Sequence, residues 1–229
     1  MNLARLLTGL EPPDLVSVSV ENQALQLERQ SAAALAKMQQ AARLDGIELA
    51  VASAYRSFDR QAAIWNGKMS GHRAVYDQQQ QQLDIQKFTG FAKLEAVLLY
   101  SALPGASRHH WGTDLDVFDA AAVASNYQLQ LQEAEYQAGG PFHKLAMWLA
   151  QYAGDFGFFR PYQQYQGGVA AEPWHLSYQP LSDFYLQQFE LLMLQQAIAQ
   201  SSLTEKPLIE QYLPDIFQRY VLNICKEAL

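Results

Sequence analysis

The sequence predicts an α+β fold, in which helices pack against a small, mostly antiparallel sheet and a helical extension follows at the C-terminus. Three observations predict this class. Residues 22–44 carry apolar side chains at helical spacing. Residues 47–53 and 113–118 are short and either apolar or alternating, as strands are. From Leu181 the pattern is helical to the end of the chain.

The first predicted elements are a long helix and a buried strand. We expect one helix over Asn22–Leu44, because Leu25, Leu35 and other apolar residues recur at helical spacing and Gly46 follows as a stop. Ile47–Ser53 is short, apolar and followed by a polar turn. This segment is predicted to be a strand that is buried on at least one face.

A second helix and a polar insertion come next. Ser57 is a residue type that caps helices, so we expect a helix from there to Asn66, ended by Gly67. Residues 68–89 are polar, contain five consecutive glutamines from Gln78 to Gln82 and show no sustained apolar period. We expect a surface insertion that can border a cleft.

The second half of the chain holds the remaining elements. Gly112 permits a sharp turn before the alternating strand 113–118. Pro207 and Pro214 are expected to break the C-terminal helices. The other predicted elements are a helix over 91–103 that ends at Pro104, an amphipathic helix over 142–152, and a short strand over 174–178.

Composition excludes several classes of protein. The formal net charge is -7, so no basic surface is expected for nucleic acid. Cys225 is the single cysteine, which excludes an intrachain disulfide and a thiolate zinc cluster. No apolar run reaches transmembrane length, and Glu11–Asp14 interrupts any signal peptide. The chain is therefore expected to be cytoplasmic, or exported with its leader removed. The sequence leaves the oligomeric state open.

Two short motifs contain residue types that commonly bind metals. Ser107–Asp116 (SRHHWGTDLD) and Glu172–His175 (EPWH) together hold three of the five histidines. A hydrolytic zinc site needs three protein ligands that leave one position for water, and imidazoles with a carboxylate are a usual set. Spacing alone does not choose between Asp114 and Asp116, or between His109 and His110.

The second motif also predicts a local bend. Pro173 disfavours helix at Glu172, so this is not the helical H-E-x-x-H arrangement. In a regular strand the side chains of Glu172 and His175 would face opposite ways. We therefore expect the chain to bend between them.

These motifs resemble those of the VanY-like D-alanyl-D-alanine carboxypeptidases, in the LAS group or peptidase family M15. The stretch Ser107–Asp116 matches S-x-H-x-x-G-x-x-x-D, and Glu172–His175 matches E-x-x-H. Upstream, Ser53–Ser57 matches S-x-Y-R-S, with Gln61 five residues after Arg56. The three motifs occur in family order between about residues 50 and 178. The resemblance implies a hedgehog/DD-peptidase-like fold.

The resemblance also implies roles for particular residues. One Zn²⁺ per chain would be held by His109, Asp116 and His175, and Glu172 would be the general base. A free C-terminal carboxylate on the substrate would be held by Arg56, Gln61 and Ser107. Arginine suits this task, because its planar guanidinium makes two charge-assisted hydrogen bonds to a carboxylate.

Two residues depart from the family pattern. Asp114 occupies a position where the family often has a small apolar residue, and we favour a supporting partner of a ligand over an alternative ligand. His110, beside a ligand, is expected to pack or hydrogen-bond locally.

The resemblance therefore implies a zinc carboxypeptidase that removes a terminal D-amino acid, D-alanine in the family's manner, from a peptidoglycan stem peptide or precursor. A D,D-dipeptidase and an L,D-carboxypeptidase would use the same metal core, and a non-catalytic cell-wall peptide-binding module would retain the fold. The expected organisation is a catalytic domain over residues 1–180, with the polar insertion at about 68–89, and a helical extension over 181–229 packed on it.

Overall fold

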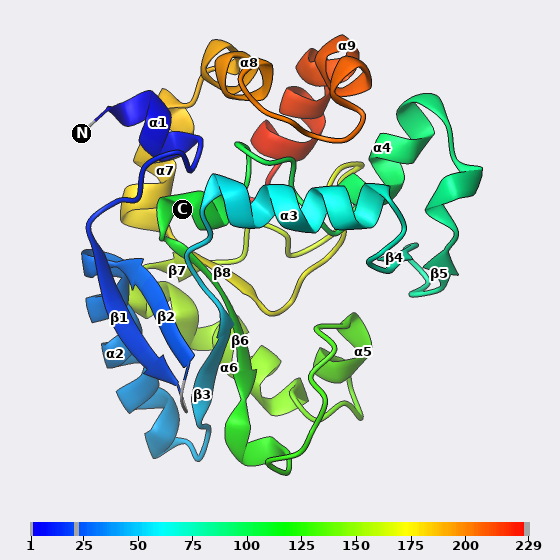
Figure 1. Ribbon diagram of the computed structural model, residues 1–229. Coiled ribbons are helices and arrows are strands. Elements are labelled where there is room, and N and C mark those ends of the chain that lie inside the picture. The colour runs from blue at the N-terminus through cyan, green and yellow to red at the C-terminus, as the bar shows by residue number, and fades with distance from the viewer. Residues whose placement is uncertain (1, 21–22, 227–229) are drawn as a thin grey trace.

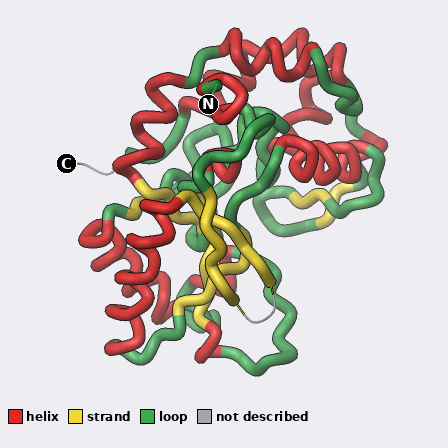
Figure 2. The backbone as a smooth tube through the Cα atoms, turned by 60° about the vertical axis from the view of Figure 1, so that its left-hand side comes forward, coloured by secondary structure: helices red, strands yellow, loops and turns green. Residues whose placement is uncertain are grey.

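The computed structural model describes residues 2–20 and 23–226. A four-stranded antiparallel sheet of order β3-β6-β8-β7 lies at the centre, flanked by helices (Figures 1 and 2). Its strands are β3 (Leu49–Ser53), β6 (Asp114–Asp119), β8 (His175–Tyr178) and β7 (Phe158–Phe159). The α+β class and the small antiparallel sheet predicted from the sequence are confirmed.

Two hydrophobic cores hold the molecule together. One core joins the central sheet to α2 (Arg29–Leu44) and α6 (His143–Tyr152). The other lies above the sheet in Figure 1 and is built from the helices α1 (Leu3–Leu7), α3 (Phe58–Met69), α4 (Gly90–Leu98), α7 (Gln179–Gln188), α8 (Leu191–Ala199) and α9 (Lys206–Ile216). The C-terminal helices thus share a core with α1 and α3, while the division of the chain at residue 180 stays a prediction.

The helix predicted over Asn22–Leu44 is wrong in its first part. Gln23–Glu28 is strand β2, which pairs antiparallel with β1 (Leu15–Val20). Leu25 and Leu27 also fit a period of two, and β1 supplies a partner strand for that pattern. The helix itself, α2, begins at Arg29, after the Glu28 carboxylate accepts hydrogen bonds from two backbone amides of its first turn.

Other predicted helix ends also differ from the observed ones. Ser57 caps α3 as expected, accepting a hydrogen bond from the backbone N–H of Arg60, but Gly67 lies inside this helix. The helix after the insertion, α4, ends at Leu98 rather than 103.

Pro207 lies in the first turn of α9, where a missing N–H costs nothing. Pro214 lies inside α9 and does not end it; the chain continues as a π-helix over Phe217–Leu222.

The polar segment 68–89 contains little regular structure, as predicted. It forms a short hairpin of β4 (Val75–Tyr76) and β5 (Gln82–Leu83), followed by a 3₁₀ turn over Ile85–Lys87. The remaining short elements are 3₁₀ turns over Arg108–Trp111, Ala120–Ala122 and Ala153–Phe156, and helix α5 (Glu133–Tyr136). Among the described residues, none of the helices is long and apolar enough to cross a bilayer.

Candidate metal centre and active site

The central sheet brings the two histidine motifs together. Asp116 lies on β6 directly opposite His175, the first residue of β8, in the antiparallel register. His109 lies in the 3₁₀ turn that precedes β6. Gly112 ends that turn with a φ of 68°, and a Cβ there would lie 2.9 Å from the backbone nitrogen of Glu28. Glycine is therefore required at the bend that returns the chain from His109 to the strand.

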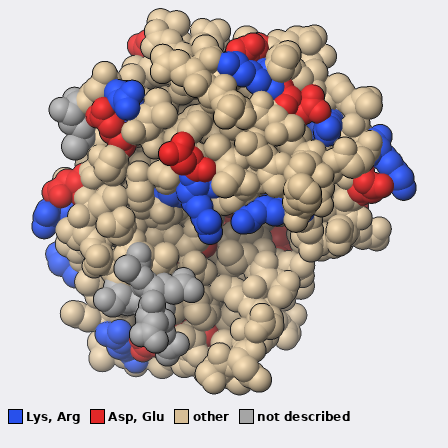
Figure 3. Space-filling view, viewed as in Figure 1, with Lys and Arg blue, Asp and Glu red and all other residues tan. Residues whose placement is uncertain are grey.

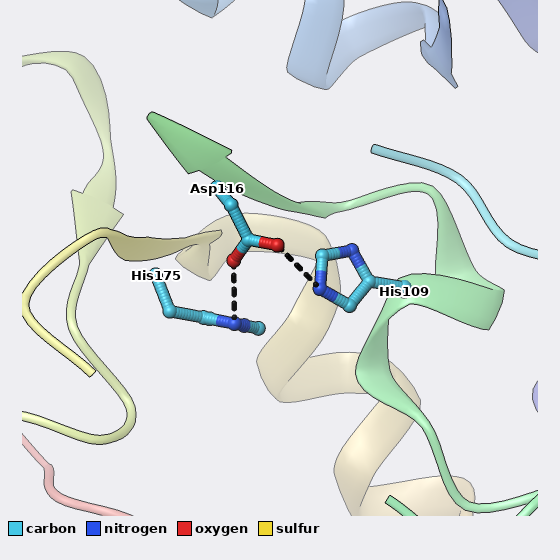
Figure 4. A group of neighbouring side chains, drawn as sticks. All are labelled: His109, Asp116 and His175. Carbon is cyan, nitrogen blue, oxygen red and sulfur yellow. Dashed lines mark ion pairs between the residues drawn. The ribbon is translucent and has the colours of Figure 1, made fainter. Parts of the chain in front are cut away.

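Figure 4 shows the side chains of His109, Asp116 and His175 pointing toward one another. His109 Nε2 lies 3.5 Å from Asp116 Oδ2, and His175 Nδ1 lies 3.2 Å from Asp116 Oδ1. One nitrogen or oxygen from each residue lies within 4.8 Å of the others, and all three residues are buried. Separations of this size are compatible with three ligands of one ion.

The outer nitrogen of each imidazole has a fixed partner. His109 Nδ1 lies 2.9 Å from the carbonyl oxygen of Ala54, and His175 Nε2 lies 3.0 Å from Asp114 Oδ1. Both partners are acceptors, so these nitrogens donate, and His109 Nε2 and His175 Nδ1 are the nitrogens that face Asp116. Such partners orient metal-binding histidines in proteins.

The electrostatics of the cluster fit a cation. Burial lowers the pKa of His109 to about 4, which keeps that imidazole neutral. The pKa of His175 is raised well above its ordinary value, because Asp114, Asp116 and Glu172 outweigh the effect of its burial. Asp116 Oδ1 is buried and, within the described part of the chain, has no hydrogen-bond partner. A buried carboxylate oxygen without a hydrogen-bond partner is suited to coordinate a metal ion.

Glu172 lies beside these three residues. The predicted bend is present: the backbone N–H of His175 donates to the carbonyl oxygen of Glu172 at 3.0 Å, which closes a turn before β8. The backbone N–H of Glu172 in turn donates to the carbonyl oxygen of Tyr162. Glu172 Oε2 lies 3.3 Å from His175 Nδ1, and burial raises the pKa of this carboxyl.

Arg56 lines the same cavity from the end of β3. Its Nη1 donates to Gln61 Oε1 at 2.7 Å, and its Nη2 donates to Ser53 Oγ at 2.9 Å. A guanidinium has five N–H donors, so three remain after these two bonds. Ser107, which precedes the turn that holds His109, also lines the cavity.

Gln61, which was expected to hold the substrate's carboxylate, contacts Arg56 rather than the cavity. This side chain is fully buried and does not line the cavity. Its Oε1 accepts from Arg56, and its Nε2 donates to the carbonyl oxygen of Ala102 at 2.6 Å. Gln61 therefore lies behind Arg56 and fixes the guanidinium, because both ends of its amide are already in use.

The two residues that depart from the family pattern both have structural partners. Asp114 accepts hydrogen bonds from Arg108 Nε at 2.8 Å, Thr113 Oγ1 at 2.6 Å and Ser177 Oγ at 3.0 Å, in addition to its contact with His175. Burial raises the pKa of Asp114, but Arg108 and these donors bring it well below its ordinary value. The carboxylate is therefore negative where it meets the imidazole.

His110 hydrogen-bonds locally, as predicted. Its Nδ1 lies 2.5 Å from the carbonyl oxygen of Arg56, and its Nε2 accepts from the backbone N–H of Gly105 at 3.1 Å. The ring thus faces away from the metal-binding cluster and connects the loop after β3 to the loop before His109.

A cavity of about 320 Å³ opens over this cluster. Sequence reasoning missed most of its walls. Its lining includes Ile64 and Lys68 of α3, Tyr76 and Gln80 of the polar insertion, Tyr100–Ala102, Gln130–Gln132 and Trp174. The spacing of Gln61, Ile64 and Lys68 on one helix face is the signal that would have indicated the contribution of α3.

Comparisons with known proteins agree with this geometry. A family model described as D-alanyl-D-alanine carboxypeptidase, VanY, matches residues 24–181. An uncharacterized protein of Haemophilus influenzae is 37% identical over 122 residues, which cover 52% of this chain and 93% of that protein.

Two solved structures share the fold. The structure of VanYB in complex with D-Alanine-D-Alanine is 22% identical and superposes with a TM-score of 0.53, covering 84% of this chain and 91% of that one. The structure of the LdcB LD-carboxypeptidase is 23% identical and superposes with a TM-score of 0.54, covering 93% of this chain and 80% of that one.

Proposed function

We propose that this chain, which belongs to the VanY family of D-alanyl-D-alanine carboxypeptidases and is a metallocarboxypeptidase by that membership, acts with one zinc ion. The proposed reaction is hydrolysis of the terminal D-alanyl-D-alanine bond, or a related bond, of peptidoglycan stem peptides or their precursors. The observation that carries the proposal is the convergence of His109, Asp116 and His175 beside Glu172 in one buried cluster.

We propose that His109 Nε2, Asp116 and His175 Nδ1 hold the zinc ion. Two imidazoles and a carboxylate are a usual ligand set for catalytic zinc, and they leave a position for water. When bound, zinc would polarise the scissile carbonyl and lower the pKa of a water molecule to about 7. Asp114 would keep His175 oriented, since it accepts from the opposite nitrogen of the ring.

Glu172 is proposed as the general base. Its carboxylate lies beside the cluster and inside the cavity. Burial raises its pKa, so the carboxylate accepts a proton more readily than an exposed one. In the proposed reaction Glu172 takes a proton from the attacking water and passes it to the leaving amine. The two steps return Glu172 to its starting state.

Arg56 and Ser107 are proposed to bind the free carboxylate of the leaving residue. Arg56 keeps three N–H donors beyond its bonds to Gln61 and Ser53, and both Arg56 and Ser107 line the cavity. Gln61 is a positioning residue in this proposal, because it holds the guanidinium without reaching substrate. Recognition of a terminal carboxylate is what makes a peptidase cut at the C-terminus.

Product analysis tests the proposal and distinguishes it from the two related hydrolase activities. The zinc-loaded protein is incubated separately with stem pentapeptide, stem tetrapeptide and free D-alanyl-D-alanine, and the products are identified by mass. Release of one D-alanine from the pentapeptide is the expected result. Cleavage of the tetrapeptide alone would instead assign an L,D-carboxypeptidase, and cleavage of the free dipeptide alone would assign a D,D-dipeptidase.

The remaining alternative is a non-catalytic cell-wall peptide-binding module. The presence of Glu172 beside the three proposed ligands favours an enzyme, because binding alone needs no general base. Peptide binding with no product from any of the three substrates would support the binding module.

A further inference from the structure

The cavity continues past the metal-binding cluster along helix α3. Gln61, Ile64 and Lys68 lie on one face of this helix, and Ile64 and Lys68 line the cavity. Lys68 follows Gln61 by seven residues, a distance of about 10 Å along the axis at about 1.5 Å per residue. Lys68 is therefore anchored two helical turns beyond Gln61, the residue that holds Arg56.

Lys68 is a partly buried cation without an anion of its own. Within residues 2–20 and 23–226, its ammonium group has no carboxylate at ion-pair distance. Burial lowers its pKa to about 8, with Glu172 acting in the opposite direction and Arg56 and Arg73 adding to the decrease. In Figure 3, Lys and Arg side chains gather along the lower edge of α3, above a hollow in the surface. A protein of net charge -7 thus places positive charge on this wall.

Tyr100, which lines the same cavity as Lys68, also offers a hydrogen-bond donor. The hydroxyl of Tyr100 accepts from Gln80 Nε2 at 2.6 Å, which leaves the hydroxyl proton of Tyr100 available. Burial raises the pKa of Tyr100 to about 12, so this proton is retained. Asp77, the acidic residue of the adjoining hairpin, accepts from the backbone N–H groups of Gln79 and Gln81 and is engaged in its own turn.

Two residues that line the cavity have strained backbones. Gln80 has a φ of 59° and Leu131 has a φ of 52°. Residues other than glycine adopt this region at a cost and concentrate at ligand-binding sites. Gln80 is held in this conformation while it positions the hydroxyl of Tyr100.

We propose that Lys68 and Tyr100 form a second anion subsite, which selects peptides that carry an acidic side chain on the N-terminal side of the scissile bond. A chain extends by about 3.5 Å per residue, so the offset of about 10 Å between Gln61 and Lys68 along α3 corresponds to two or three residues of an extended peptide. This inference rests on the proposed function, because the register of the peptide is set by Arg56 and the metal-binding cluster.

A pair of isosteric peptides tests the subsite. The peptides are acetyl-L-Glu-D-Ala-D-Ala and acetyl-L-Gln-D-Ala-D-Ala, and the measured quantity is the ratio of their kcat/KM values. A charge-assisted hydrogen bond from Lys68 predicts a preference for the glutamate peptide of roughly tenfold. Lys68→Met should abolish the preference, Lys68→Arg should retain it, and Lys68→Glu should favour a peptide with lysine at that position. Lys37→Gln, an exposed change on α2, is the matched control.

The outcomes separate the subsite from the proposed function. Equal kcat/KM values for the two peptides with the parent enzyme overturn the subsite. So does an equal loss with both peptides in Lys68→Met, because Lys68 would then act on the terminal carboxylate or on the fold. If the zinc-loaded parent releases no D-alanine from either peptide, the proposed function fails, and calorimetric binding of the same peptides decides the subsite alone. Tighter binding of the glutamate peptide supports it, and equal affinities or no binding overturn it.

Discussion

The Asp114 carboxylate lies 3.0 Å from Nε2 of His175, while Nδ1 of the same ring lies 3.2 Å from Asp116. One strand, β6, therefore contacts both edges of one imidazole through two carboxylates. Arg108 neutralises Asp114 through a buried ion pair of 2.8 Å. The consequence is an imidazole whose orientation is set before any metal arrives.

Replacement of Asp114 should weaken metal binding. In Asp114→Asn the side chain no longer carries the charge that orients His175, so we expect a loss of zinc affinity of about 10- to 100-fold. Competition with a chelating dye measures this affinity. Asp119→Asn, at the far end of β6, is the control and should leave it unchanged, since the Asp119 side chain accepts hydrogen bonds from the backbone of Glu48 and Ala121, away from the metal-binding cluster. Equal affinities in all three proteins would contradict the supporting role of Asp114.

Replacement of Gln61 should affect substrate binding more than the chemical step. Gln61→Ala leaves the carbonyl of Ala102 and one donor of Arg56 without a partner, which should cost about 1–3 kcal/mol of unfolding free energy. Because the Arg56 guanidinium is then no longer held in place, KM should rise more than kcat falls. Gln61→Glu keeps an acceptor for Arg56, so its KM should lie close to that of the parent enzyme. A fall in kcat alone, with KM unchanged in both variants, would show that Gln61 acts elsewhere.

The preference for an acidic peptide should depend on pH. Lysine is positively charged below its pKa, and burial lowers that of Lys68 to about 8. The preference in kcat/KM for the glutamate over the glutamine peptide should therefore be full between about pH 6 and 7, where the peptide's glutamate is ionised, and decline as the pH rises through 8. Both peptides experience the same titration of the metal-binding cluster, so the ratio isolates Lys68. In Lys68→Arg the preference should persist to higher pH, and a decline at the same pH would assign the effect to another group.

Replacement of Glu172 should separate chemistry from metal binding. Glu172→Ala removes the proposed base but none of the three proposed ligands, so kcat should fall by about 10²- to 10⁴-fold while zinc remains bound. Steady-state kinetics and metal analysis of the same sample give both quantities. Glu210→Ala, an exposed change on α9, serves as the control. Turnover equal to that of the parent would remove Glu172 from the mechanism.

The motifs predicted the centre of the site better than its surroundings. The bend at Glu172–His175 could be expected from local chain geometry, whereas the metal ligands were implied by the family resemblance and meet through the pairing of β6 with β8. The choice between Asp114 and Asp116 was different. Both lie on one strand face and both contact His175, so the sequence alone could not separate a ligand from its support.

Long-range packing decided what the sequence did not predict. Gln23–Glu28 became a strand because β1 pairs with it, although Leu25 also fits the helical spacing of the residues that follow. Gln61 turned inward because Arg56 and the carbonyl of Ala102 use both ends of its amide. Gln80 reached the cavity from within a glutamine run, where no period distinguishes one residue from the next.

The most direct test of the central claim is D-alanine release from stem pentapeptide, measured before and after removal of metal. A chelator should abolish release, and one equivalent of zinc per chain should restore it, because His109, Asp116 and His175 form a single site. Full activity in a sample verified to be free of metal would contradict the account.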